Sequence, residues 1–171
     1  AALASQLGVS RTPVREALAR LASEGLVAAE GRSFILPALG VGDIEDIYAL
    51  RFLLEPEALR LVAASRPEKK QLAPLRKALE DMAAAHESGD GATFMEANYR
   101  YRDAWTALVP NGRLVRAIQL YADHVRYLRA FTLDAAAVRA LVLKGLKQLT
   151  AALAAGDGEA AAKAMRAHLD N

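Results

Sequence analysis

The stretch between Leu7 and Val27 restricts the fold most strongly, because it specifies a helix, both of its ends and the turn before it. Gly8 adopts positive φ at low cost, which suits a turn after a short helix over residues 2–6. Ser10 can cap the following helix, and Pro13 falls in its first turn, where a missing N–H costs little. Gly25 can end that helix as a left-handed cap. The stretch therefore predicts two helices joined by a tight turn.

The polar side of the second helix has the chemistry of a nucleic-acid interface. Arg11 and Arg15 are four residues apart and share one face. Val14, Ala17 and Leu18 belong to an apolar face. In a major groove, arginine can bind guanine through a bidentate fork, and Ser10 or Thr12 can contact phosphate. A capped helix with a solvated arginine face is the simpler alternative for any single arginine pair. The complete run from the turn to Gly25 favours DNA binding.

Two short strands are predicted after this helix, over residues 27–30 and 33–36. They would form a wing around Gly31 and Arg32. Arg32 would then lie near the tip, where it could reach a minor groove or a phosphate.

From about residue 41 onward the chain shows helical periodicity, interrupted by turn signals such as Gly89-Asp90-Gly91 and Gly156-Asp157-Gly158. Trp105 falls on an apolar stripe and is predicted to pack in the core. The predicted helices cover roughly residues 43–64, 67–88, 94–108, 114–131, 135–155 and 159–171. The chain is thus predicted to be mainly α, with a winged helix-turn-helix domain over residues 1–40 and an antiparallel bundle of about six helices over residues 41–171.

Composition excludes function classes rather than selecting one. The 171 residues contain no cysteine, and 53% of them are hydrophobic, enough for a helical core. The sequence shows no paired carboxylates, no nucleophile–base pair and no set of metal ligands, so an enzyme is not expected. No run of about 18 apolar residues predicts a membrane span, and we expect a cytoplasmic protein. The formal net charge is only +2, so DNA binding is predicted from where the arginines lie.

The first segment resembles a known DNA-binding domain. Leu3-Ala4, residues 7–18 and Glu24-Gly25-Leu26-Val27 are similar to the winged helix-turn-helix of GntR-family transcriptional regulators. The resemblance implies that Ser10, Arg11, Thr12, Arg15 and Gly31 lie at the operator. The chain begins at what would be the second helix of that domain, so a further helix is expected before it.

The rest of the chain resembles the FadR subfamily, whose helical part is the FCD domain. The resemblance is carried by residues 47–51, Leu54-Glu55, residues 152–157 and residues 165–169. It implies a dimeric, ligand-responsive repressor or activator. In this subfamily the helical domain dimerises and binds a small effector, commonly a carboxylate-bearing metabolite or an acyl derivative.

Many members of the subfamily hold a metal ion inside the bundle. The resemblance implies ligands at four positions: an Asp, a His four residues later, and two further His on the last two helices. Here these positions read Asn98, Arg102, Leu146 and His168. Asn is a poor ligand, Arg repels a cation and Leu cannot ligate, so no bound metal and no cofactor are predicted.

Arg102 suggests a different effector site. If it points into the bundle, its buried charge needs a partner, and its guanidinium could bind the effector carboxylate directly. Asn98, His168 and Arg51 would complete the polar lining. The alternative is that Arg102 pairs with a bundle carboxylate such as Glu55 without any ligand. For His168 alone, a structural histidine near the helix end is the simpler interpretation, and Arg51 with Glu55 is most simply an i, i+4 salt bridge.

The leading functional hypothesis is a regulator that binds a palindromic operator in double-stranded DNA as a homodimer and responds to a small carboxylate. The alternative is a dimerisation module with a degenerate, ligand-free effector site.

Overall fold

The computed structural model describes residues 2–23, 25, 27–31, 33–35 and 40–170. The chain divides into two compact units, Ala1–Ile44 and Glu45–Asn171. The division falls near the start of helix α3 (Val41–Ala64). Each unit is described separately below.

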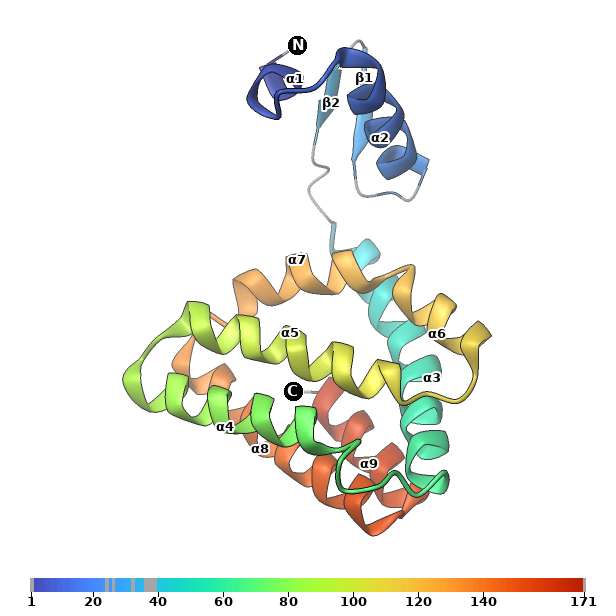
Figure 1. Ribbon diagram of the computed structural model, residues 1–171, viewed down its shortest axis with the longest axis vertical. Helices are drawn as coiled ribbons and strands as arrows, with labels where there is room; N and C mark the ends of the chain where they lie inside the picture. The colour runs from blue at the N-terminus through green and yellow to red at the C-terminus, as the bar shows by residue number, and fades with distance from the viewer. Residues whose placement is uncertain (1, 24, 26, 32, 36–39, 171) are drawn as a thin grey trace. The chain divides into compact units, whose positions relative to one another are not determined.

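The first unit contains helices α1 (Ala2–Gln6) and α2 (Arg11–Ser23) and strands β1 (Ala28–Glu30) and β2 (Ser33–Ile35), as Figure 1 shows. The strands are antiparallel, with Ala29 opposite Phe34. Gly8, Gly25 and Gly31 all have positive φ, so the turns lie where the sequence predicted them. The predicted helix-turn-helix with a two-stranded wing is therefore confirmed.

One residue of this unit differs from the sequence prediction, and four residues named in the prediction are not described by the structure. On the apolar side of α2, Val14 and Leu18 are half-buried. Ala17, which was expected on the same face, is exposed. Glu24, Leu26, Arg32 and Leu36 lie outside the described residues.

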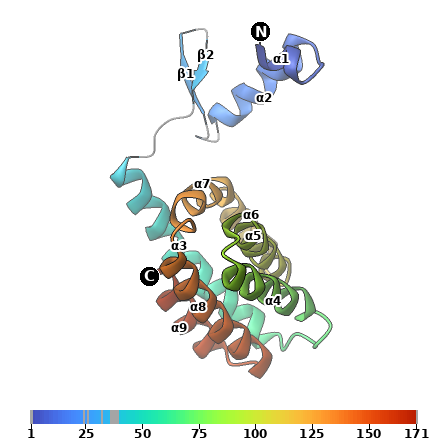
Figure 2. The ribbon, with the colours of Figure 1, turned by 90° about the vertical axis from the view of Figure 1, so that its left-hand side faces the viewer.

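The second unit is a helical bundle. It contains most of α3 followed by α4 (Ala73–Ser88), α5 (Gly91–Ala107), α6 (Gly112–Gln119), α7 (Ala122–Thr132), α8 (Ala136–Ala155) and α9 (Gly158–Leu169). Helices α4 and α5 pack together, α8 packs with α9, and α4 also packs on α8 (Figure 2). The mainly helical fold class is confirmed.

The caps explain both helical hairpins. Gly89 ends α4 and Gly156 ends α8 in the left-handed conformation. The next residue in each turn, Asp90 or Asp157, accepts a backbone N–H from the helix that follows. Trp105 is 2% exposed in the bundle interior, as predicted for a core residue.

The predicted helix over residues 114–131 is wrong, because the structure has two helices there. Helix α6 ends at Gln119 and α7 begins at Ala122. At the junction the N–H of Tyr121 donates to the carbonyl of Ile118, three residues back, at 3.4 Å. Neither Pro nor Gly marks the break, so the sequence carried no signal for it. The helix expected from residue 67 instead begins at Ala73, with Pro74 in its first turn, where proline is tolerated.

Candidate functional site

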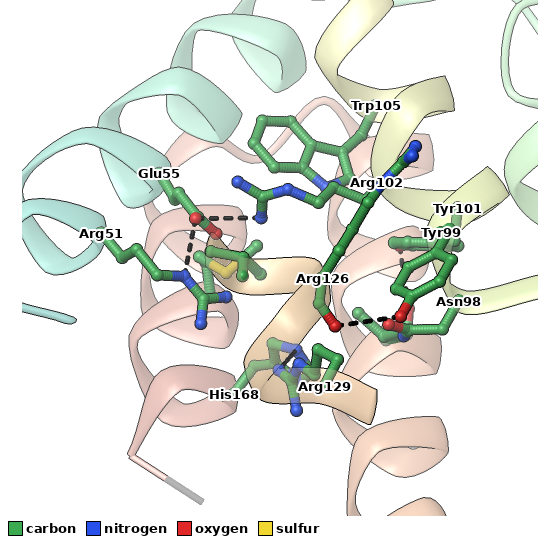
Figure 3. Close-up of a pocket in the computed structure, with 13 residues that line it drawn as sticks. Arg51, Glu55, Asn98, Tyr99, Tyr101, Arg102, Trp105, Arg126, Arg129 and His168 are labelled. Atoms are coloured by element: carbon green, nitrogen blue, oxygen red, sulfur yellow. Dashed lines mark hydrogen bonds and ion pairs between the residues drawn. The ribbon is translucent and has the colours of Figure 1, made fainter. Parts of the chain in front are cut away.

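Five helices of the bundle enclose a small cavity, which we call the arginine cavity. Its volume is about 30 Å³, enough for about two water molecules. Figure 3 shows its polar lining, which converges from segments far apart in the sequence. The lining residues that carry charge or a polar group are Arg51 and Glu55 from α3, Asn98, Tyr99, Tyr101 and Arg102 from α5, Arg126 and Arg129 from α7, and His168 from α9.

Glu55 joins two arginines. Its Oε1 accepts a hydrogen bond from Arg51 Nε at 2.9 Å and another from Arg102 Nη1 at 3.0 Å, as Figure 3 shows. Its other oxygen, Oε2, is buried and has no hydrogen-bond partner. Burial alone would raise the pKa of Glu55, but the charges of Arg102 and Arg51 hold that pKa below its usual value. Glu55 is therefore a buried carboxylate anion, and a single one of its oxygens binds both cations.

Arg102 and Arg51 are also held by aromatic rings. The Arg102 guanidinium lies 5.5 Å from the centroid of the Trp105 ring, and that of Arg51 lies 4.8 Å from the Tyr48 ring. Burial lowers the pKa of Arg102, although Glu55 opposes the shift. The two guanidinium groups are thus held in fixed orientations.

Arg129 and His168 form a second buried pair. Arg129 Nη2 lies 3.2 Å from His168 Nε2, and both residues are 8% exposed. Because arginine can only donate, Nε2 must accept, which places the proton of a neutral imidazole on Nδ1. Burial, reinforced by Arg129, lowers the pKa of His168 to about 3. Burial, reinforced by Arg51, lowers the pKa of Arg129 to about 10, so its guanidinium stays charged at neutral pH.

Two further polar residues of the lining, Asn98 and Tyr101, are held by neutral contacts. Asn98 Nδ2 lies 3.8 Å from Met82 Sδ, a weak hydrogen bond, and Asn98 is 8% exposed. The Tyr101 hydroxyl lies 2.8 Å from the Thr150 hydroxyl. Asn98 therefore keeps most of its hydrogen-bonding capacity available on the cavity wall.

The four residues predicted to line an effector site, Asn98, Arg102, His168 and Arg51, all lie on the wall of the arginine cavity. The predicted Arg51–Glu55 salt bridge is present. The pairing of Arg102 with Glu55, which the sequence left open as an alternative, is present as well.

Sequence reasoning missed Arg129. A signal existed, since Arg129 lies four residues from both Val125 and Leu133, and these two side chains are buried. A charge centred on the buried stripe of a helix requires a compensating group, and only the fold identifies His168 as its neighbour.

The four positions at which the resemblance implied metal ligands do converge here. Asn98, Arg102, Leu146 and His168 all line the arginine cavity. Their donor set does not fit a metal ion, because it offers one amide, one imidazole and a guanidinium that repels cations. In the part of the chain that the structure describes, no group of three or more His, Cys, Asp or Glu side chains could hold a metal.

A larger cavity adjoins the arginine cavity at Arg102. Its volume is about 210 Å³, and α5 and α6 form most of its wall. Arg102 and Asp103 supply the charge, whereas Val115 and Ile118 supply apolar surface. An engineered apolar cavity of about 150 Å³ can hold benzene, so this space suits the body of a small metabolite.

In the first unit, the predicted DNA-contacting side chains are accessible. Ser10, Arg11, Thr12 and Arg15 are exposed around the start of α2, and Gly31 turns the wing at a φ of 60°. Arg32, the remaining predicted contact, lies outside the described residues. Among the helices that the structure describes, none combines the length and apolar character needed to span a membrane.

Both units match known families. Residues 46–171 match the model described as FCD domain, and residues 1–35 match the model described as bacterial regulatory proteins, gntR family. The chain is 42% identical over 108 residues to an uncharacterized HTH-type transcriptional regulator in the TAR-I ttuE-ttuC' intergenic region of Agrobacterium vitis. That match covers 61% of this chain and 63% of the relative.

Escherichia coli McbR is a second relative. The chain is 39% identical to this HTH-type transcriptional regulator over 101 residues, which cover 58% of this chain and 45% of McbR. The chain therefore spans less than two thirds of the length of either curated relative in these matches. The solved structure of E. coli McbR/YncC aligns with a TM-score of 0.83 at 29% identity, covering 98% of this chain and 80% of that chain.

Proposed function

Because this chain belongs to the FCD-domain subfamily of the GntR family of transcriptional regulators, we propose that it binds an operator as a homodimer and responds to a small carboxylate. The carboxylate binds in the bundle at Arg102. The winged helix-turn-helix reads the DNA.

The orientation of Arg102 carries the effector part of the proposal. Its guanidinium is held between Glu55 and the Trp105 ring, and it lines both cavities. A carboxylate that takes over hydrogen bonds from Glu55 would place its charged end at the arginine cavity. The larger cavity would receive the uncharged body, because the arginine cavity holds only about two waters.

The exposed start of α2 carries the DNA part. Arg11 and Arg15 share the exposed face of its first turns. The N-terminal turns of a recognition helix enter the major groove in helix-turn-helix proteins, and two copies read half-sites about one helical turn apart. The family membership supports the same assignment.

The effector proposal is tested by calorimetric titration of the chain with butyrate at constant ionic strength. We expect saturable binding that Arg102→Gln weakens at least tenfold. Arg113→Gln, an exposed arginine of α6, is the matched control and leaves the affinity unchanged. Equal binding by the two variants would contradict the proposal.

The DNA proposal is tested independently by selecting bound fragments from a random duplex library, followed by anisotropy titrations. We expect a palindromic consensus whose binding Arg15→Ala weakens. Arg20→Ala, in the last turn of the same helix, is the matched control. Failure to enrich any sequence at low salt would contradict the proposal.

A ligand-free dimerisation module is the second candidate, and one observation favours it. Glu55 already supplies Arg102 with a carboxylate, so that pair needs no ligand. Absence of any binding in the effector titration, together with a normal dimer, would select this candidate.

A further inference from the structure

The arginine cavity has more positive than negative charge. Arg51, Arg102 and Arg129 are cations on its wall, and Glu55 is the one buried carboxylate among the described residues. His168 is neutral because its Nε2 accepts from Arg129. Two buried cations, Arg51 and Arg129, and the half-buried Arg102 therefore face one buried anion.

Neighbouring surface charges do not correct this imbalance. Arg126, which also lines the cavity, is exposed and pairs with the exposed Asp103 at 3.3 Å, so these two charges offset each other. Arg129 forms no ion pair among the described residues, and its one hydrogen bond goes to a neutral ring. A buried charge without a counter-charge is costly, which is why such sites normally contain a partner or a bound ion.

Only one of the two carboxylate oxygens of Glu55 binds arginine. Both of its ion pairs use Oε1, and Oε2 accepts nothing. Its single negative charge thus serves Arg51 and Arg102 and leaves Arg129 without a carboxylate. Two further negative charges would be needed to balance the arginines of this cavity, and one of them would have to lie beside Arg129.

We propose that the effector is a small dianion, a dicarboxylate or a phosphate monoester, rather than a monocarboxylate. One anionic group displaces the Glu55 carboxylate from Arg102, the second neutralises Arg129, and the larger cavity receives any remaining uncharged part of the ligand. This inference rests on the proposed effector site and specifies the charge of its ligand. Arg129 would be the residue that sets the preference for two charges over one.

Competition with Glu55 follows from the volume of the cavity. With room for about two waters, the arginine cavity cannot admit two anionic groups unless the Glu55 side chain moves away from the arginines. Glu55 therefore acts as an internal substitute for the ligand. Removing its charge should strengthen dianion binding, whereas removing an ordinary contact residue would weaken it.

The test compares succinate with butyrate, which have the same number of carbons and differ by one carboxylate. Calorimetry of the chain at constant ionic strength and pH 7.5 should give at least tenfold tighter binding for succinate. In Arg129→Gln, which keeps a donor for His168, the two affinities should fall within twofold of each other. Arg102→Gln should weaken both. Inorganic phosphate is the third probe, and its rank against succinate distinguishes a phosphate ligand from a dicarboxylate.

Glu55→Gln should tighten succinate binding several-fold. Glu57→Gln, which removes an exposed carboxylate of the same helix paired with Arg60, is the matched control and should change nothing. A measurement without ligand adds an independent check: Arg129→Gln should raise the melting temperature of the bundle, since it removes an uncompensated buried charge.

The outcomes separate the two proposals. Equal affinities for butyrate and succinate in the unmodified chain would overturn the dianion inference and leave the effector proposal standing. A preference for succinate that persists in Arg129→Gln would have the same consequence. Absence of binding by all three probes would overturn both. A lower melting temperature for Arg129→Gln would show that Arg129 is already neutralised and would also overturn the inference.

Discussion

Glu55 is the buried counter-charge of two arginines inside the bundle. It is 1% exposed and forms ion pairs with Arg51 and Arg102 through one oxygen. A buried ion pair contributes little net stability over an apolar replacement, but loss of one partner leaves the other charge buried alone. Here the loss of Glu55 would leave two arginines in that state.

Glu55→Ala should therefore lower the free energy of unfolding of the bundle by about 3 kcal/mol or more. The measurement is urea unfolding followed by the fluorescence of Trp105, the single tryptophan of the chain, which lies inside the bundle. Glu57→Ala is the control and should stay within about 0.5 kcal/mol, because its pair with Arg60 is exposed. Equal effects of the two variants would contradict the assignment of Glu55 as a buried counter-charge.

His168 makes the bundle sensitive to acid. Burial and then Arg129 lower its pKa from an ordinary value of 6.5 to about 3, so between these values the unfolded chain binds a proton that the folded chain does not. Stability must then fall as the pH falls through this window, by at most about 1.4 kcal/mol per pH unit. We expect a loss on the order of 2 kcal/mol between pH 6.5 and 4.5. Glu55 contributes only below this range, because its pKa is held under its usual value.

The measurement is the same unfolding experiment repeated between pH 7.5 and 4.5. His168→Gln should flatten the dependence, while His124→Gln, outside the arginine cavity, should preserve it. A steep dependence that persists in His168→Gln would mean that another group accounts for the acid sensitivity.

At the scale of elements, the contact between α8 and α9 depends on the absence of one side chain. A Cβ at Gly145 of α8 would lie 3.1 Å from Nδ1 of His168 on α9. Alanine in place of glycine inside a helix ordinarily stabilises by about 1 kcal/mol. Glycine at position 145 therefore lowers the stability of helix α8 but leaves space for the His168 ring.

Gly145→Ala should consequently bring no gain in stability, or a loss, in the unmodified chain. In a His168→Ala background the same change should stabilise by about 1 kcal/mol, because the crowding is gone. The four proteins form a double-mutant cycle measured by urea unfolding. A gain of the same size in both backgrounds would show that the two side chains do not interact.

The sequence predicted helix ends and turns well where nearby residues determine them. Gly8, Gly25 and Gly31 mark turns that need positive φ, and Asp90 and Asp157 cap the helices after their turns. Such features act over a few residues and can be read from spacing alone. The break between α6 and α7 has no such cause and was missed.

The candidate site was predicted only in part for the same reason. Asn98, Arg102 and His168 were identified only because the family resemblance implied ligand positions there. Arg129 has no counterpart in that pattern, and its pairing with His168 joins residues 39 apart in the chain. Contacts at that separation depend on how helices pack, which local periodicity does not specify.

At the scale of the whole molecule, regulation requires that the two units influence each other. The proposed effector residues lie in Glu45–Asn171 and the proposed DNA contacts lie in Ala1–Ile44, so the two ligands would bind residues of different units. If the effector changes operator affinity by some factor, thermodynamic linkage requires the operator to change effector affinity by the same factor. Such coupling is typically about 1–3 kcal/mol, or roughly 5–150-fold.

Substitutions in the two units should therefore separate binding from coupling. Arg102→Gln should retain operator affinity and lose its response to the effector. Arg15→Ala should retain effector affinity and weaken the operator complex by about 1–3 kcal/mol, the usual cost of losing an arginine contact to a base. Anisotropy titrations of operator DNA with and without effector, and calorimetry of the effector with and without operator, measure both sides of the cycle.

Equal changes in operator affinity and in effector affinity would establish linkage between the units. An operator affinity that does not change when effector is bound would contradict the regulatory proposal, even if each unit binds its own ligand.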